Sequence, residues 1–169
     1  RKADRPIKVL NLFAYTGGAT LAARSAGADT THVDSVKQVV TWARENMESS
    51  GLDGVRWIVE DATKFVEREV RRGNKYHGII LDPPAFAKHH KVLGNAMQGY
   101  KRLNARALSQ IKSGGILFTF SCSQAVSKEL FRTTVFTAAA IAGRKVRILH
   151  QLTQPTDHPI NIYHPEGEY

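Results

Sequence analysis

The chain has few cysteines, few acidic residues and no long apolar run. A single cysteine among 169 residues excludes an internal disulfide and fits a reducing, cytoplasmic setting. No apolar run approaches the ~20 residues that cross a bilayer, and no leader resembles a signal peptide. We therefore expect no membrane partner. Residues 1–6 lack a methionine and look like a severed linker.

Strand and helix signals alternate along the chain, as in a parallel sheet wrapped by helices. No internal repeat, low-complexity run or second-domain boundary interrupts the pattern, and the tail after residue 154 is predicted to be a surface loop. We expect one α/β domain with a doubly wound, Rossmann-like sheet. Strands are predicted at 8–13, 31–34, 55–59, up to 82, 115–120 and 145–152, and helices at 19–26, 36–48, 62–72, 99–111 and 128–142.

The segment 79–86, I-I-L-D-P-P-A-F, is the most informative part of the sequence. Its apolar run predicts a strand buried on both faces. Proline has no N–H and a fixed φ, so Pro83 and Pro84 end the strand and stiffen the loop that follows. Asp82 is thereby predicted at the carboxyl end of a strand, where open α/β sheets bind ligands. A simple strand-ending turn is the alternative.

Positive charge is in excess, with 24 Lys and Arg against 15 Asp and Glu and a formal net charge of +9. This favours a polyanionic partner, because phosphate neutralisation and counterion release drive nucleic-acid binding. A basic surface can also serve solubility alone. One basic group, at 88–91, directly follows the Asp-Pro-Pro loop and favours RNA or DNA.

Three other predicted strand ends also carry suggestive groups. The turn 13–19 is glycine-rich and leads into a helix, whose first N–H groups are free donors, but it lacks the G-x-G-x-x-G pattern. Asp34 is placed to accept ribose hydroxyls, and Asp61 to reach an adenine amino group. Either acid could instead cap the following helix. Together, the four strand ends predict a ligand that contains adenosine.

This order of motifs resembles the class I S-adenosylmethionine-dependent methyltransferases. Several segments are similar, more closely, to the bacterial large-subunit ribosomal RNA cytosine-5 methyltransferases. They are 81–86 (L-D-P-P-A-F), 99–104 (G-Y-K-R-L-N), 114–123 (G-G-I-L-F-T-F-S-C-S), 157–159 (D-H-P) and 163–169 (Y-H-P-E-G-E-Y). The resemblance covers nearly the whole chain and implies S-adenosylmethionine as the cofactor, ribosomal RNA as the partner and a possible homodimer. Cofactor contacts are implied at Phe13, Ala14, Tyr15, Thr16, Gly17, Gly18, Asp34, Ser35, Asp61, Ala62 and Asp82.

The chain departs from the family in two ways. The family carries an N-terminal RNA-binding PUA domain and a central domain, and we expect residues 1–169 to hold the methyltransferase domain alone. The family also continues into a last, antiparallel strand beyond the final segment, and this strand is expected to be missing. We therefore expect either an incomplete sheet or an excised or engineered core.

Cytosine carbon 5 becomes nucleophilic only after a group adds to carbon 6, and a thiolate does this well. Cys122 lies between two serines at a predicted strand end, so we expect it to be the catalytic nucleophile, although a lone cysteine is often a buried hydrophobe. Asp82 is expected to hydrogen-bond the base and stabilise charge. Phe86 is expected to stack on a flipped base. The position directly after the second proline is Ala85 and not an aromatic residue, which argues against direct methylation of an amine.

The expected substrate contacts are Pro83, Pro84, Phe86, Lys88, Lys101 and Arg102, the last three as phosphate contacts that could equally be solvated. No metal site is expected, because the spacing of His89, His90 and Cys122 matches no zinc pattern.

Two other functions remain open on the sequence. The enzyme could methylate a nitrogen or a substrate other than RNA, or the shortened chain could bind cofactor or RNA without turnover. A nicotinamide dehydrogenase is a distant further candidate. The sequence identifies neither the target nucleotide nor the base that removes the carbon-5 proton.

Overall fold

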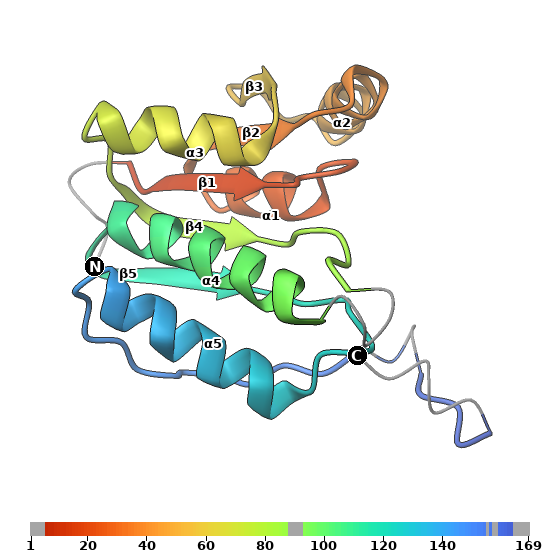
Figure 1. Cartoon of the computed structure of the whole chain (residues 1–169). Coiled ribbons are helices and arrows are strands. Elements are labelled where there is room, and N and C mark those ends of the chain that lie inside the picture. The colour runs from red at the N-terminus through yellow and green to blue at the C-terminus, as the bar shows by residue number, and fades with distance from the viewer. Residues whose placement is uncertain (1–5, 88–92, 155, 157–158, 164–169) are drawn as a thin grey trace. The chain divides into compact units, whose positions relative to one another are not determined.

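Five parallel strands form one sheet in the computed structural model, which describes residues 6–87, 93–154, 156 and 159–163 (Figure 1). The strand order is β3-β2-β1-β4-β5. The chain fills one side of β1 first and the other side afterwards, so the order reverses between β1 and β4. Such a reversal marks the ligand-binding edge of doubly wound sheets. The strands are β1 (Lys8–Leu12), β2 (Asp29–Asp34), β3 (Arg56–Val59), β4 (Tyr76–Leu81) and β5 (Ile111–Thr119).

The helices alternate with these strands along the chain, as the sequence predicts. They are α1 (Gly18–Ser25), α2 (Lys37–Ser49), α3 (Ala62–Arg71), α4 (Leu93–Gln110) and α5 (Lys128–Ile141). α1 packs on β1 and β2, α2 on β2 and β3, and α3 on β2. None of the described helices is long and apolar enough to cross a membrane.

The chain divides into two compact units. Unit 1 comprises Arg1–Asp82 and Ser109–Phe120 and holds the whole sheet with α1, α2 and α3. Unit 2 comprises Pro83–Leu108 and Ser121–Tyr169 and holds α5 and most of α4.

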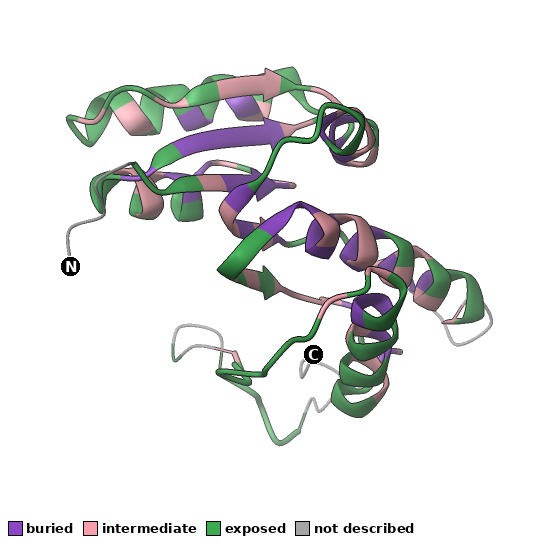
Figure 2. Cartoon of the chain, turned by 90° about the vertical axis from the view of Figure 1, so that its left-hand side faces the viewer, coloured by how far each residue is buried: buried purple, intermediate pink, exposed green. Residues whose placement is uncertain are grey.

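The core of unit 1 is built on the central strands, where Leu10, Leu12, Val33, Ile79 and Leu81 are fully buried (Figure 2). Strands covered on both faces become apolar runs, which is why the sequence of β4 lacks polar alternation. Unit 2 has a smaller core of Ala87, Ala96, Tyr100 and Val126, against which Phe86 and Phe131 pack.

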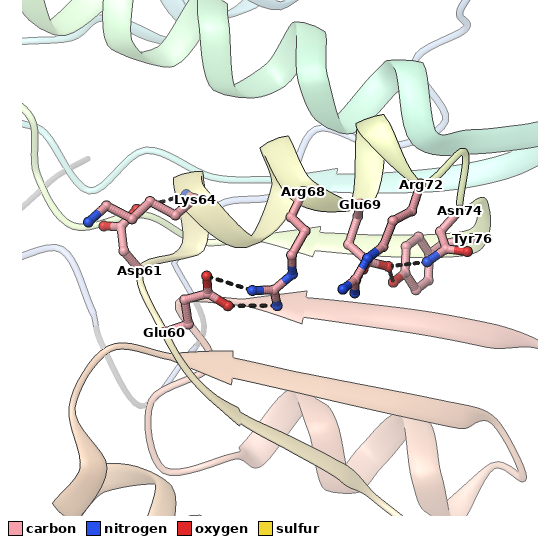
Figure 3. Close-up of polar contacts among 8 residues, drawn as sticks. All are labelled: Glu60, Asp61, Lys64, Arg68, Glu69, Arg72, Asn74 and Tyr76. Carbon is pink, nitrogen blue, oxygen red and sulfur yellow. Dashed lines mark hydrogen bonds and ion pairs between the residues drawn. The ribbon is translucent and has the colours of Figure 1, made fainter.

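A buried carboxylate anchors the turn between α3 and β4 (Figure 3). Glu69 is fully buried and accepts hydrogen bonds from the Tyr76 hydroxyl at 2.6 Å, the Asn74 amide at 2.7 Å and Arg72 at 3.4 Å. Burial alone would raise the pKa of Glu69, but these hydrogen bonds and the charge of Arg56 outweigh it and lower that pKa. The carboxylate therefore stays ionised inside the protein.

One predicted strand is wrong. Residues 145–152 form no strand, and their apolar side chains are exposed, at 65% for Leu149 and 63% for Leu152. A strand exists through hydrogen bonds to a neighbouring strand, and β-type composition alone does not supply that neighbour.

Two element boundaries differ from the prediction by several residues. α4 begins at Leu93 instead of 99, because Leu93 and Met97 pack on the unit 2 core although Gly94 and Asn95 resemble a loop. β5 begins at Ile111 instead of 115, pairing with Tyr76 through an irregular register. Gly114 accommodates the irregularity with a φ of +76°.

Candidate cofactor and catalytic sites

The glycine turn after β1 is held in an unusual backbone conformation. Phe13 and Tyr15 have positive φ values of 58° and 48°, and Gly17 has a φ of 90°. Non-glycine residues in this region cost about 1–3 kcal/mol each and cluster at ligand sites. A Cβ on Gly17 would lie 3.1 Å from the Cβ of Ala43 in α2, which is tighter than an ordinary contact, so glycine permits this approach without a shift of α2. The turn leads into α1, whose Gly17 N-cap supplies no side-chain acceptor for the first N–H groups of the helix.

Asp34 ties this turn to the end of β2. Its Oδ2 accepts a hydrogen bond from the Tyr15 N–H and its Oδ1 accepts one from the Val36 N–H, each at 3.0 Å. The carboxylate is half-buried and fixed in orientation from two sides. Each carboxylate oxygen has a second lone pair to offer a ligand hydroxyl. Asp34 therefore orders the turn, and its contact with a ribose stays a prediction.

Three buried polar side chains connect β1, α1 and β2 in unit 1. The Asn11 amide donates to the Thr20 hydroxyl at 2.9 Å, and this hydroxyl lies 3.0 Å from His32 Nδ1. All three residues are at most 2% exposed. Burial lowers the pKa of His32 to about 4, although the charge of Asp34 acts in the opposite direction. His32 is therefore neutral at pH 7, and a Cβ on Gly17 would lie 3.8 Å from its ring.

The acids after β3 have structural partners (Figure 3). Asp61 is the N-cap of α3 and accepts from the Lys64 N–H at 2.9 Å, which is the capping alternative weighed for it above. Glu60 forms an ion pair at 2.7 Å with Arg68, which lies in α3. Capping uses one oxygen of Asp61, so its role toward a cofactor stays a prediction.

The strand registers bring the predicted residues of unit 1 to one edge of the sheet. Leu12 pairs with Val33 and with Leu81, so the glycine turn, Asp34 and Asp82 follow three adjacent strand ends. Asp82 is exposed as a residue, yet neighbouring protein atoms remove part of the water from its carboxyl and raise its pKa. Ser35 is exposed, whereas Ala62 is buried in the first turn of α3.

In unit 2 the structure brings Cys122 next to the proline loop. The half-buried thiol donates to the Pro83 carbonyl oxygen at an Sγ–O distance of 3.7 Å. The Ser123 hydroxyl accepts from the Ala87 N–H at 3.3 Å and lies 2.9 Å from the Tyr100 hydroxyl. The segments P-P-A-F-A and S-C-S therefore lie side by side, as expected from their positions after adjacent strands.

The other predicted substrate residues differ in their surroundings. Pro83 is buried and Pro84 exposed. Phe86 packs on Tyr100 with ring centroids 4.7 Å apart, so one side of its ring is already occupied. Lys101 is half-buried and Arg102 exposed, both on α4. Lys88 lies outside the described residues, as do His89 and His90. Among the described residues, no three His, Cys, Asp or Glu side chains cluster as a metal site would require.

The sequence did not reveal the buried polar side chains that lie near the glycine turn and near Cys122. Asn11, Thr20 and His32 are polar residues inside apolar or small-residue stretches, and this mismatch is the signal that could have found them. Tyr100 was noted only as part of a family-like segment. Its burial beside two serines depends on the tertiary structure.

Comparison with known proteins identifies the family of the chain. A family model for S-adenosylmethionine-dependent methyltransferases matches residues 2–161. The chain belongs to this family. Class I methyltransferases of this kind bind S-adenosylmethionine, and a solved methyltransferase complexed with SAH superposes with a TM-score of 0.82 at 25% identity. That alignment covers 96% of this chain and 43% of the other. The predicted family, fold class and cofactor are thus confirmed.

Curated relatives of the chain have a more specific name. Ribosomal RNA large subunit methyltransferase I from Aeromonas salmonicida is 40% identical over 165 residues, and that from Klebsiella pneumoniae subsp. pneumoniae is 37% identical over the same length. Both alignments cover 96% of this chain, but only 42% and 41% of the relatives. The chain therefore spans about two fifths of the length of these relatives.

Proposed function

We propose that the chain methylates carbon 5 of a cytosine in large-subunit ribosomal RNA, with Cys122 as the covalent nucleophile. The observation that carries this proposal is the placement of the only cysteine in unit 2. Its thiol is half-buried, faces the proline loop and lies between two hydrogen-bonded serines. The names of the curated relatives support ribosomal RNA as the substrate, and so does the net charge of +9.

The reaction needs a nucleophile because carbon 5 of cytosine is weakly nucleophilic. The Cys122 thiolate adds to carbon 6, and the resulting enamine attacks the methyl group of the cofactor sulfonium. The carbon–sulfur bond of the cofactor breaks and leaves S-adenosylhomocysteine. A base then removes the proton from carbon 5, and the bond from Sγ to carbon 6 breaks to release 5-methylcytosine and the thiolate.

Residues of unit 1 are assigned to binding the cofactor and to stabilising charge on the cytosine ring. Asp34 accepts the ribose hydroxyls, and the glycine turn with the first N–H groups of α1 lies against the cofactor. Asp82 donates to or accepts from the edge of the cytosine ring. A raised pKa suits this role, because a carboxyl that is protonated more readily can share a proton with a ring nitrogen.

The decisive test is Cys122→Ala assayed for tritium transfer from labelled S-adenosylmethionine to ribosomal RNA. The proposal predicts loss of turnover, with binding of S-adenosylhomocysteine kept within about twofold of wild type, because it assigns cofactor binding to residues of unit 1. Retained turnover would contradict the covalent mechanism and favour methylation of a nitrogen. Cofactor binding by the wild-type chain without any transfer would identify a core that binds but does not catalyse.

A further inference from the structure

We propose that Tyr100 is a positioning residue for Cys122 and fixes the turn that carries the thiol. The inference rests on the proposed function of Cys122 and concerns residues of unit 2 only. Tyr100 is fully buried on α4. Its hydroxyl lies 2.9 Å from the Ser123 hydroxyl and 3.2 Å from the Ser121 hydroxyl. One buried hydroxyl thus holds the residues on both sides of the cysteine.

The donors and acceptors of this cluster form a consistent chain. Ser121 donates its hydroxyl proton to the Tyr100 oxygen, which leaves the single Tyr100 proton for Ser123. The Ser123 N–H donates a hydrogen bond to the Ser121 hydroxyl oxygen at 3.3 Å, so a backbone group of the turn also bridges it. Removing the tyrosine hydroxyl breaks the hydrogen bonds of both serines to Tyr100 in one step and leaves only this backbone bridge.

The tyrosine itself is held firmly enough to serve as an anchor. Its ring packs on Phe86 at 4.7 Å and edge-on against Phe131 at 5.5 Å between centroids. Its carbonyl oxygen accepts from the Asn104 amide at 2.9 Å. A ring packed from two directions cannot swing its hydroxyl away from the turn. Tyr100 therefore couples the position of the cysteine turn to that of α4.

The same cluster reaches the loop that faces the thiol. Ser123 accepts from the Ala87 N–H, and Cys122 donates to the Pro83 carbonyl. Both ends of the loop 83–87 are thus tied to the cysteine turn. A displacement of about 1 Å at a reacting atom can cost on the order of 100-fold in rate, so a turn fixed in this way determines how well the thiolate reaches carbon 6.

The test is Tyr100→Phe, which keeps the packed ring and removes only the hydroxyl. We expect kcat to fall about 10- to 100-fold, with KM for S-adenosylmethionine within twofold, because the cofactor residues belong to unit 1. Iodoacetamide supplies a second measurement. Cys122 is the only cysteine, so alkylation reports on this thiol alone and requires no methyl transfer. We expect alkylation about three times faster or more, because a loosened turn releases the thiol from the Pro83 carbonyl.

Tyr76→Phe is the matched control, since it removes a buried tyrosine hydroxyl from the Glu69 cluster of unit 1. It is expected to lower stability without changing alkylation under native conditions. Ser121→Ala cuts the same hydrogen-bond chain at a half-buried position and replaces Tyr100→Phe if that variant does not fold. The double variant Ser121→Ala with Tyr100→Phe should lose less than the sum of the two single effects, because both changes remove the same Ser121–Tyr100 hydrogen bond.

The outcomes separate this inference from the proposed function. If Tyr100→Phe alters neither kcat nor the alkylation rate, the positioning role is overturned, whatever Cys122 does. If Cys122→Ala keeps its turnover, the covalent mechanism fails, while faster alkylation in Tyr100→Phe would still show that the hydroxyl positions the thiol.

Discussion

Replacing Asp34 by alanine should separate the structural role of this carboxylate from its proposed role in cofactor binding. The change removes two hydrogen bonds of 3.0 Å, from the N–H groups of Tyr15 and Val36, together with the acceptors for a ribose. A hydrogen bond to a charged group contributes about 1.5–3 kcal/mol. Loss of the ribose contacts should therefore raise Kd for S-adenosylhomocysteine on the order of 100-fold.

The stability effect follows from the same hydrogen bonds. Asp34 is half-buried, so the released N–H groups regain water, and we expect a loss of about 1 kcal/mol for each, or ~2 kcal/mol in total. For a domain of this size, ~2 kcal/mol lowers Tm by about 4–8 °C. The loss also frees Tyr15 to leave its positive φ, which loosens the cofactor turn.

Calorimetric titration with S-adenosylhomocysteine, paired with thermal unfolding, measures both effects. Asp34→Asn keeps the shape and one oxygen acceptor, and should bind between wild type and Asp34→Ala. Asp53→Ala is the control, because this acid of unit 1 is 94% exposed and pairs only with Arg24 at 3.3 Å among the contacts described. A Kd for Asp34→Ala within threefold of wild type would refute the assignment of Asp34 to the cofactor.

Three further predictions concern the buried polar groups and the glycine turn. Tyr76→Phe leaves the Glu69 carboxylate without its 2.6 Å hydrogen bond and should lower the free energy of unfolding by about 1–3 kcal/mol in urea titrations; an unchanged value would contradict the role of this cluster. The pKa of His32 is lowered by burial to about 4 from an ordinary value of 6.5, so the unfolded chain binds the extra proton first and stability is lost as pH falls from 6.5 toward 4. Wild type should therefore lose ~2 kcal/mol through His32 between pH 7 and pH 5, and His32→Gln should lose correspondingly less over the same interval. Gly17→Ala places a Cβ 3.1 Å from Ala43 at a φ of +90° and should weaken S-adenosylhomocysteine binding at least tenfold with a cost of about 1–3 kcal/mol in stability; wild-type affinity in this variant would show that the turn does not need its glycine.

The fold was largely predictable because its signals are local. Short strand segments that end at Asp34 and Asp82 predicted the shared edge of the sheet, and the register of Leu12 with Val33 and Leu81 confirms that edge. The strand predicted at 145–152 does not form, because a β-type composition is a local property whereas a strand also needs a neighbouring strand to pair with.

The candidate sites were only partly predictable, for the same reason. Glycines, acids and the single cysteine stand out by residue type, and the family resemblance gave each a role. Asn11, Thr20 and Tyr100 act through buried hydrogen bonds to residues distant in the sequence, so no spacing rule points to them. The capping bond of Asp61 illustrates the reverse case, since a local rule predicted that contact directly.

Covalent trapping tests the central claim most directly. Ribosomal RNA that carries 5-fluorocytidine should be incubated with the protein and S-adenosylmethionine and analysed by mass spectrometry. Fluorine cannot leave carbon 5 as a proton does, so the methylated adduct cannot collapse. We predict a stable protein–RNA adduct on the peptide that contains Cys122, absent in Cys122→Ala. Methylated RNA with no adduct on that peptide would contradict the account.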